Sequence, residues 1–354
     1  LARVRERGLP LHLGFLVGAG AVKAAVRGYA AGAMTPAELN AARCLVAQGM
    51  EAGALGLSVG LMYQPECWFA ETELIALASV AARYGGRMTA HIRGEGDSLV
   101  ASVDEVLRIA AAAGLPLQIS HFKATGIRNW DRLIFEAIEH IERARAAGQE
   151  VTVDFYPYAG GSTTLQSLLP PTLLEDDPSS MLRRLGTPEG KRRLRRELQR
   201  PHPGWDNMAE SIGWDRILVS ATTRPENAAL QGESLLDSAR RLGYDDPAEL
   251  VAELLCSEAG RVGIIVMSMS QRDVDAIARL PYSMLISDAL YARTDHPHPR
   301  LYGAFPRFLH EYAVERGVLP LETAIEKMTR LPAERLGLRE RGVLCPGAHA
   351  DVLA

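Results

Sequence analysis

The chain has 354 residues, of which 47% are hydrophobic and 23% charged, and its formal net charge is −4 at pH 7. These values are typical of a folded globular protein and exclude a disordered chain. The weak negative charge and the aromatic content of 6% argue against nucleic acid and acidic membranes as partners. No run of about 18 apolar residues occurs, so no membrane-spanning helix is predicted.

The four cysteines are widely scattered and form no Cys-x-x-Cys pair: Cys44, Cys67, Cys256 and Cys345. This usage favours free thiols in a reducing compartment over a disulfide framework. The opening residues also lack the basic-then-apolar order of a signal peptide. We therefore expect a bacterial-type cytoplasmic enzyme.

The chain begins with residues typical of the end of an amphipathic helix, followed by an apolar run at residues 9–18 that predicts a first strand. Thr35 and Glu38 then have the spacing of a capping box, with Pro36 at the first helical position. A helix is expected from there to about Glu51.

Short apolar runs then alternate with stretches of helical period. Further strands are expected at residues 54–60, 87–91, 116–121 and 150–156. Helices are expected between them at about residues 72–84, 98–113 and 129–147. This alternation indicates βα units and a parallel sheet.

A long insertion of mixed character, at about residues 160–260, precedes the last strand, which ends at Asp288. Its basic run at residues 191–196 is interspersed with acidic residues and predicts an exposed helix. Strand-like runs at residues 216–220 and 263–267 could extend a barrel or form a lid beside it. The closing residues 347–354 look like a strand that is cut short.

The regular alternation of predicted strands and helices gives six strands, whereas a (β/α)8 barrel has eight. An α/β barrel can reach this length as one domain, so a single domain over residues 1–354 is the default prediction. The missing strands could come from the insertion, but a clipped N-terminus is the better explanation.

Three polar residues that can bind a metal end predicted strands: His91, His121 and Asp288. The carboxyl ends of parallel strands meet at one rim, so the fold would bring these side chains together. Two neutral imidazoles and one carboxylate make a plausible open site for Zn²⁺ with room for a water. The alternative without a metal is that these three residues are ordinary hydrogen-bonded residues of the core.

Several motifs recur in a consistent order along the chain. They are Gly53-Ala-Leu-Gly-Leu-Ser-Val-Gly-Leu-Met-Tyr63, Thr-Ala-His91-Ile-Arg-Gly-Glu, Ile-Ser-His121-Phe-Lys123, Asp154-Phe-Tyr156-Pro-Tyr-Ala-Gly-Gly-Ser162, Ile-Ser-Asp288, His296-Pro-His-Pro-Arg300 and Met328-Thr-Arg-Leu-Pro-Ala. Together they resemble the N-acyl-D-amino-acid deacylases (D-aminoacylases) of the amidohydrolase superfamily. The match spans nearly the whole chain.

This resemblance implies a zinc-dependent β/α barrel that hydrolyses N-acyl-D-amino acids to a D-amino acid and a carboxylate. His91 and His121 would bind one or two Zn²⁺ ions from the fifth and sixth barrel strands. Asp288, on the eighth, would be both a ligand and the proton shuttle between a metal-activated water and the leaving nitrogen.

The substrate is then a small N-acyl amino acid, whose free carboxylate needs cationic partners. Lys123 and Arg300 match the family positions for that task. Tyr63, Tyr156 and Ser162, also carried over by motif, would supply hydroxyl groups to the carboxylate or to the developing oxyanion.

The chain also departs from the family pattern. Family members begin with part of a small β-sandwich, a His-x-His on the first barrel strand and a metal-binding Cys on the second, and none of these matches this chain. We therefore expect an incomplete barrel, strands 3 to 8, truncated at both ends. Ala289 stands where the family usually has Gly, and Ala19 where it often has His.

Two alternatives stay open. The same metal site could open a cyclic amide, as in dihydroorotase-like or hydantoinase-like relatives, or the chain could be a catalytically inactive segment of a deacylase. Among nearby residues, Arg93 and Glu95 are expected to form a local ion pair, and His298 to stabilise a loop. Side-chain preference and oligomeric state cannot be deduced from the sequence.

Overall fold

Six parallel strands form the main sheet of the protein, in a computed structural model that describes residues 2–9, 11–291 and 294–353. The strands are β1 (Val17–Gly18), β2 (Gly56–Gly60), β3 (Arg87–His91), β4 (Leu117–Ile119), β5 (Val151–Phe155) and β9 (Ser283–Leu285). They lie side by side in that order, so each strand pairs with the next one of the series. All six are strands that the sequence predicts.

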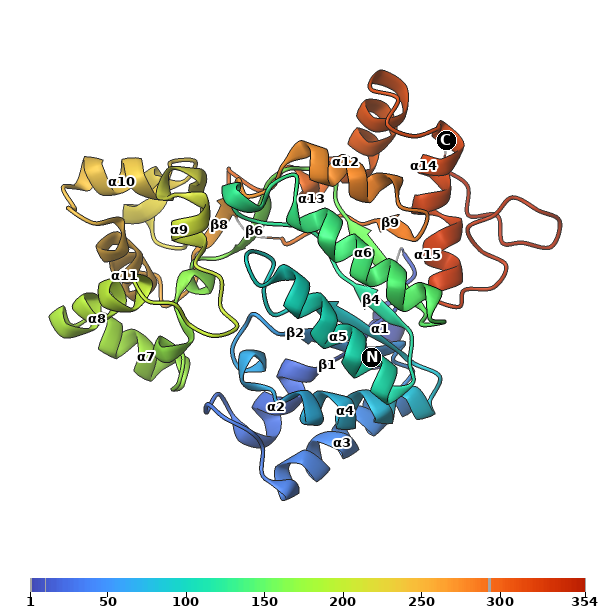
Figure 1. Ribbon diagram of the computed structural model, residues 1–354, viewed down its shortest axis with the longest axis horizontal. Coiled ribbons are helices and arrows are strands. Elements are labelled where there is room, and N and C mark those ends of the chain that lie inside the picture. The colour runs from blue at the N-terminus through green and yellow to red at the C-terminus, as the bar shows by residue number, and fades with distance from the viewer. Residues whose placement is uncertain (1, 10, 292–293, 354) are drawn as a thin grey trace.

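Helices connect these strands, as parallel pairing requires. They are α2 (Ala19–Arg27), α3 (Pro36–Glu51), α4 (Glu71–Arg83), α5 (Leu99–Ala113), α6 (Leu133–Ala146) and α12 (Gln271–Arg279). In addition, α1 (Ala2–Arg7) precedes β1, and α13 (Arg300–Arg307), α14 (Leu321–Met328) and α15 (Arg330–Arg335) follow β9. A π-helical turn at Phe308–Glu315 continues α13. Figure 1 shows α4, α5 and α6 side by side along the sheet.

Local sequence signals explain where these helices begin and end. The capping box of α3 is formed, since the Thr35 side chain accepts from the Glu38 N–H and the Glu38 carboxylate accepts from the Thr35 N–H. Gly114 ends α5 in the left-handed conformation, with φ 68°. Both outcomes confirm the predictions from the sequence.

The core lies between the sheet and its helices. Leu57, Met88, Leu117 and Val153 are each fully buried on four successive strands. Along β3 the exposure alternates, with Met88 and Ala90 buried and His91 only partly so. This two-residue period places the polar end of the strand at the rim of the sheet.

Two predictions at the chain ends are wrong. The described residues of this run before Val17, which are residue 9 and residues 11–16, form no strand, and Leu11 and Leu13 are 79% and 62% exposed. The cause is pairing: the ladder with β2 contains only Val17 opposite Leu57 and Gly18 opposite Ser58. The described residues 347–353 likewise form no strand.

The insertion has its own sheet and its own core. Its elements are β6 (Gly161–Thr164), α7 (Pro178–Leu185), α8 (Pro188–Leu198), α9 (Met208–Ile212), β7 (Ile217–Ala221), α10 (Leu235–Leu242), α11 (Pro247–Ser257) and β8 (Gly263–Val266). The three strands form an antiparallel sheet in the order β6-β8-β7. A second hydrophobic cluster runs from Leu165 to Val266. The two strand-like runs of the insertion therefore do not extend the parallel sheet.

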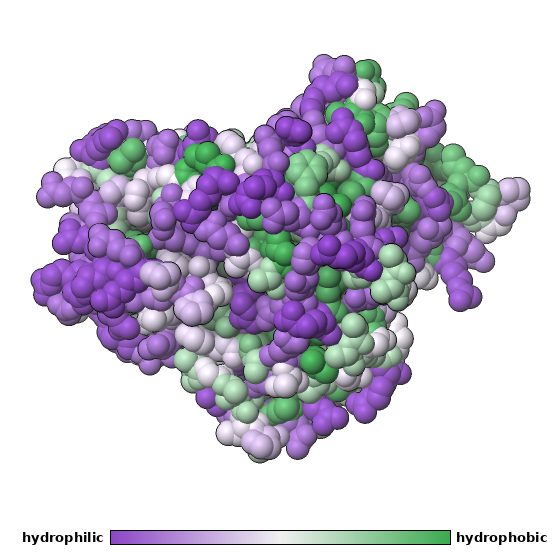
Figure 2. Space-filling model, viewed as in Figure 1, coloured by the Kyte–Doolittle hydropathy of each residue, from purple (hydrophilic) through white to green (hydrophobic). Residues whose placement is uncertain are grey.

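The basic run in α8 lies on the surface, as predicted. Lys191 and Arg195 pair with Glu253 and Glu249 of α11 at 2.5 and 2.8 Å. Figure 2 shows that the end of the molecule formed by these helices is mostly hydrophilic on the face shown. In the described part of the chain, no helix combines the length and apolar character needed to cross a bilayer.

Candidate metal centre

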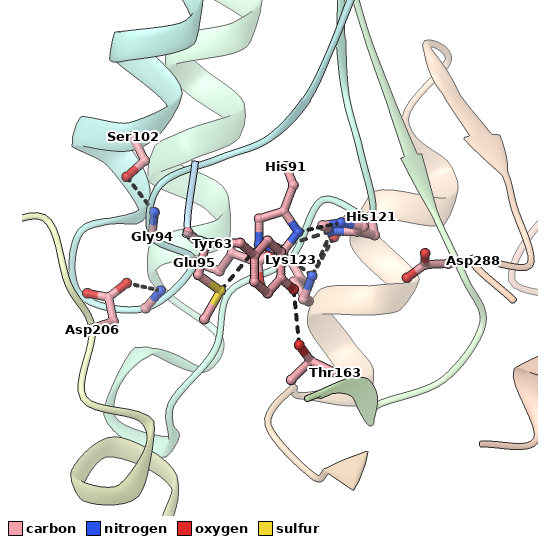
Figure 3. A network of polar contacts seen from close by, with 12 residues as sticks. Tyr63, His91, Gly94, Glu95, Ser102, His121, Lys123, Thr163, Asp206 and Asp288 are labelled. Carbon is pink, nitrogen blue, oxygen red and sulfur yellow. Dashed lines mark hydrogen bonds and ion pairs between the residues drawn. The ribbon is translucent and has the colours of Figure 1, made fainter. Parts of the chain in front are cut away.

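The two histidines singled out by the sequence lie against each other at the rim of the parallel sheet. His91 is the last residue of β3, and His121 follows β4 by two residues. The His91 Nδ1 and His121 Nε2 atoms are 2.8 Å apart. Figure 3 shows the two imidazoles side by side. Their side chains are 14% and 10% exposed, so both are shielded from bulk water.

Glu95 completes a cluster of three possible metal ligands. Its Oε1 atom lies 3.1 Å from His121 Nδ1 and 4.0 Å from His91 Nε2. One donor atom from each of the three residues falls within 4.8 Å of the others. Two imidazoles and one carboxylate suit Zn²⁺, which accepts nitrogen and carboxylate ligands and keeps an open position in catalytic sites. The donor set therefore fits a zinc ion.

The charge state of this cluster also suits a cation. Burial lowers the pKa of His91 to about 3, so its imidazole is neutral at pH 7 and keeps a lone pair for a metal. Burial by itself would raise the pKa of Glu95, but the ammonium of the nearby Lys123 holds that pKa well below its ordinary value. The carboxylate is therefore ionised.

Lys123 supplies the positive charge that stabilises Glu95. Its Nζ atom donates to Glu95 Oε1 at 2.5 Å and lies 2.8 Å from His121 Nδ1. Burial opposes the charged form, yet the Glu95 carboxylate raises the pKa of Lys123 above its ordinary value. Lys123 therefore carries its charge inside the site.

The backbone that presents His121 is in an unusual conformation. Its φ angle is +37°, in the left-handed region that a residue with a Cβ seldom adopts. The buried carboxylate of Asp154 on β5 accepts the His121 N–H at 2.5 Å and the Gln118 Nε2–H at 2.7 Å. These bonds hold the imidazole at the rim.

Asp288 has the same kind of backbone, with φ +46°, and it pairs with Arg300. The Arg300 Nη1 atom lies 2.8 Å from Asp288 Oδ2. Figure 3 shows the Asp288 carboxylate turned toward the imidazoles but separate from them. Asp288 is thus at the site without being part of the three-residue ligand cluster.

Arg300 joins three of the predicted site residues. It is 2% exposed, donates from Nη2 to the Ser162 carbonyl at 3.2 Å, and places its guanidinium carbon 4.5 Å from the centre of the Tyr156 ring. Tyr63, across the site, has its hydroxyl 3.1 Å from Thr163 Oγ1 and its ring 4.8 Å from that of His91. Burial raises the pKa of Tyr63 to about 12, so its hydroxyl is protonated and can donate.

One cavity of about 380 Å³ collects all of these side chains. Every site residue that the sequence predicts lines it: Tyr63, His91, His121, Lys123, Tyr156, Ser162, Asp288 and Arg300. Glu95 and Met208 of the insertion line it too. The structure therefore brings together residues that are up to 237 positions apart in the chain, Tyr63 to Arg300.

The expected Arg93–Glu95 ion pair is wrong. Arg93 pairs with Glu105 of α5 at 2.8 Å, and Glu95 points into the cavity. The loop after β3 turns between these neighbours, so their side chains diverge. His298, by contrast, stabilises its loop as expected, with Nε2 2.8 Å from the Gly160 carbonyl and Nδ1 accepting the Arg300 N–H.

Sequence reasoning missed Glu95 and Asp154 as parts of the site. Glu95 lies four residues past His91 in an irregular loop, where no periodicity indicates which way a side chain points. Asp154 is an acidic residue inside an otherwise apolar strand. That anomaly was the one available signal, because a buried carboxylate needs hydrogen-bond donors.

The chain is similar to several known proteins. Residues 219–354 match the model of the Amidohydrolase family (Amidohydro_3). An N-acyl-D-glutamate deacylase from Alcaligenes xylosoxydans xylosoxydans is 38% identical over 316 residues, which are 89% of this chain and 54% of that protein. A D-aminoacylase from the same organism is 32% identical over 348 residues, 96% of this chain and 59% of the relative.

A solved structure shares the fold. The N-acyl-D-glutamate deacylase from Bordetella bronchiseptica, complexed with zinc and a phosphonate inhibitor that mimics the tetrahedral intermediate, superposes with a TM-score of 0.80. It is 34% identical, and the alignment covers 99% of this chain and 63% of that one. The chain thus spans somewhat more than half the length of the relatives it matches. It is an α/β protein of the amidohydrolase fold and belongs to the D-aminoacylase family of the amidohydrolase superfamily.

Proposed function

We propose that this protein takes part in the zinc-dependent hydrolysis of N-acyl-D-amino acids, which gives a D-amino acid and a carboxylate. The observation that carries the proposal is the cluster of His91, Glu95 and His121 in the same cavity as Lys123 and Arg300. Metal ligands and cations for a substrate carboxylate thus face one space. The names of the related deacylases support the same reaction.

We propose His91 and His121 as ligands of one or two Zn²⁺ ions, with Glu95 or Asp288 supplying a carboxylate. Bound zinc would supply Lewis acidity toward the amide carbonyl and lower the pKa of a coordinated water. Asp288 is the proposed general base and acid, which takes a proton on a carboxylate oxygen and returns it to the leaving nitrogen. Its ion pair with Arg300 orients that carboxylate.

The remaining residues are proposed to hold the substrate. Arg300 and Lys123 bind its free carboxylate, and the protonated hydroxyl of Tyr63 donates to it or to the oxyanion. Tyr156 and Ser162 complete the wall next to Arg300. The substrate is in this proposal a small N-acyl amino acid.

We also propose the organisation and location of the protein. Residues 1–354 are proposed as one amidohydrolase barrel domain, with an insertion at about residues 160–260 that contains the second core. A reducing compartment such as the cytoplasm is supported by the four cysteines, which are all unpaired.

The test is an assay of the purified protein with measured zinc content. N-acetyl-D-amino acids, their L enantiomers, and a panel of hydantoins and dihydropyrimidines are compared as substrates. We expect zinc-dependent hydrolysis of the D substrates. Turnover of the cyclic amides alone would make the protein a cyclic-amide hydrolase, and absence of any turnover would identify an inactive segment; either result overturns the proposal.

Substitution of the histidines tests the ligands. His91→Ala and His121→Ala should each lower zinc affinity by at least about 100-fold, because each removes a direct ligand, whereas removing a residue that only hydrogen-bonds to a ligand already costs about 10–100-fold. His310→Ala is the matched control, since the His310 side chain is 70% exposed and lies outside the cavity. Unchanged zinc affinity in both histidine variants would contradict the ligand assignment.

A further inference from the structure

Glu95 lies on a loop outside any strand or helix, so no regular pattern of backbone hydrogen bonds fixes its position. Residues 92–98 connect β3 to α5 without regular secondary structure. The position of Glu95 therefore depends on what binds the backbone amides of this loop.

Asp206, which belongs to the insertion, binds that backbone. Its Oδ2 atom accepts the Gly96 N–H at 2.7 Å, and its Oδ1 atom accepts the Ser98 N–H at 3.0 Å. The Ser98 hydroxyl donates a third bond to Oδ2 at 3.0 Å. A single carboxylate thus satisfies three donors, and Figure 3 shows Asp206 beside this loop.

The loop has the glycines that such a close approach requires. A Cβ placed on Gly94 would lie 2.5 Å from Asp206 Oδ2, and one placed on Gly96 would lie 3.1 Å from it. Neither glycine has a positive φ, so backbone freedom does not account for them. The space beside Gly94 is instead filled by the Ser98 hydroxyl, the atom nearest to such a Cβ, and by the Asp206 carboxylate, which also fills the space beside Gly96.

Helix capping does not explain the contact either. Ser98 stands at the N-cap of α5, where a serine hydroxyl commonly accepts a backbone N–H of its own helix. Here it makes no such bond and donates to Asp206 instead. Ser98 thus binds the insertion and does not make the capping hydrogen bond to α5.

The other side of the loop is bound to the segment that follows β4. The Glu95 carbonyl accepts the Thr125 N–H at 2.7 Å. Glu95 is therefore fixed between Thr125, which follows His121 and Lys123 in the chain, and Asp206 of the insertion. Met208, two residues after Asp206, lines the same cavity.

We propose that Asp206 is a positioning residue: by binding the backbone of Gly96 and Ser98 it holds the Glu95 carboxylate against His121 and Lys123. The insertion in this way takes part in assembling the metal centre as well as covering it. This inference rests on the proposed zinc-dependent function, because its effect is measured as zinc binding and turnover.

The test compares Asp206→Ala, Asp206→Asn and Asp206→Glu. Loss of the carboxylate should lower zinc affinity by about 10–100-fold, the size seen when an outer partner of a metal ligand is removed. The amide oxygen of Asn accepts at one position only, so Asp206→Asn should lie between Ala and wild type. Asp206→Glu keeps a carboxylate and should therefore recover part of the zinc affinity that Asp206→Ala loses. In Asp206→Ala, kcat should fall by a larger factor than KM rises.

Asp177→Ala is the matched control. Asp177 also lies in the insertion and also accepts two backbone N–H bonds, from Ser179 and Ser180 at the start of α7, but it does not line the cavity. It should leave zinc affinity unchanged. An equal loss of affinity in both alanine variants would show general destabilisation and overturn the proposal.

Amide hydrogen exchange separates this inference from the proposed function. Asp206→Ala should speed exchange at Gly96 and Ser98 by at least about tenfold, and Asp177→Ala should not. If the wild type binds no zinc, the proposed function fails while this exchange result still reports on the loop. If Asp206→Ala is poorly folded, Ser98→Ala, which removes one bond, should give a smaller loss of the same kind. Wild-type zinc affinity and exchange in folded Asp206 variants would overturn the inference.

Discussion

At the scale of single residues, Glu95 and Lys123 form a buried ion pair inside the site. Each side chain is 10% exposed, so water screens the pair poorly. Lys123 has no other carboxylate within hydrogen-bond distance among the described residues. The ammonium of Lys123 therefore depends on Glu95.

Glu95→Gln should destabilise the protein by about 3 kcal/mol or more, because it leaves a buried ammonium without its counter-charge. Adding Lys123→Met should restore at least half of that loss. A double-mutant cycle measured by urea unfolding checks both values. The control is the exposed pair of Arg108 and Glu71, where Glu71→Gln should cost no more than about 1 kcal/mol. A Glu95→Gln cost as small as this control would contradict the prediction.

From the pattern of apolar runs alone, the site residues at strand ends could be predicted, and Glu95 and Asp206 in loops could not. His91, His121 and Asp288 follow apolar runs whose length and direction are set by burial, so their place at the rim is predictable. Glu95 and Asp206 are fixed by hydrogen bonds between segments that are 110 residues apart in the chain. No pattern within a short stretch of sequence indicates which residue so far along the chain will form the hydrogen bond.

At the scale of elements, the sequence predicts the positions of strands and helices well where a strand pairs with another regular strand and where a helix has its own capping residues. The six strands of the parallel sheet and the capping box of α3 are examples. Residues 11–16 show the opposite, since this apolar run forms no strand and the ladder with β2 begins only at Val17. A strand forms only when an adjacent strand can accept and donate its backbone hydrogen bonds, and the periodicity of one segment does not show whether such a strand is present.

Asp273 of α12 makes stability depend on pH. Its carboxylate accepts the Asp131 N–H at 3.1 Å, at a residue with φ +57°, and burial raises its pKa from 3.8 to about 6. The folded state thus keeps the proton over a pH range in which the unfolded state has released it. The contribution of this group to stability is full below pH 4 and is lost as the pH rises toward 6 and above.

Asp273→Asn should remove this dependence, because the amide oxygen still accepts the Asp131 N–H and does not ionise. Relative to wild type, the variant should gain free energy of unfolding between pH 4 and pH 6.5. Urea unfolding at several pH values within this range measures the difference. Glu322→Gln at an exposed site of α14 serves as the control. A constant difference between Asp273→Asn and wild type over this range would show that the prediction is wrong.

At the scale of the whole molecule, the described residues form two hydrophobic clusters, one around the parallel sheet and one inside the insertion. The three clustered ligand candidates, His91, Glu95 and His121, lie beside the first of these, on or just after β3 and β4. Asp206 is a direct hydrogen-bonded link from the insertion to the ligand loop. Binding at the site should therefore stabilise the two clusters unequally.

Zinc at a free concentration of 100 times its Kd should raise the free energy of opening around the site by about 2.7 kcal/mol. The amide of Val153 in β5 should gain most of this protection in hydrogen exchange, and that of Val219 in β7 much less. A chelator should reverse the gain at Val153. Equal gains at both amides would indicate one cooperative unit, and no gain at either would contradict zinc binding at this site.

The sequence by itself determined the α/β class of the protein, the six strands of its sheet, and His91, His121 and Asp288 at strand ends, because burial and alternation are local properties that apolar runs encode directly. The other five predicted side chains of the cavity came from motifs that resemble a known family. Tertiary structure alone decided that Glu95 joins the histidines, that Asp288 pairs with Arg300, and that an aspartate of the insertion binds the ligand loop. Those outcomes depend on hydrogen bonds and ion pairs between distant segments, whose geometry exists only once both segments are packed.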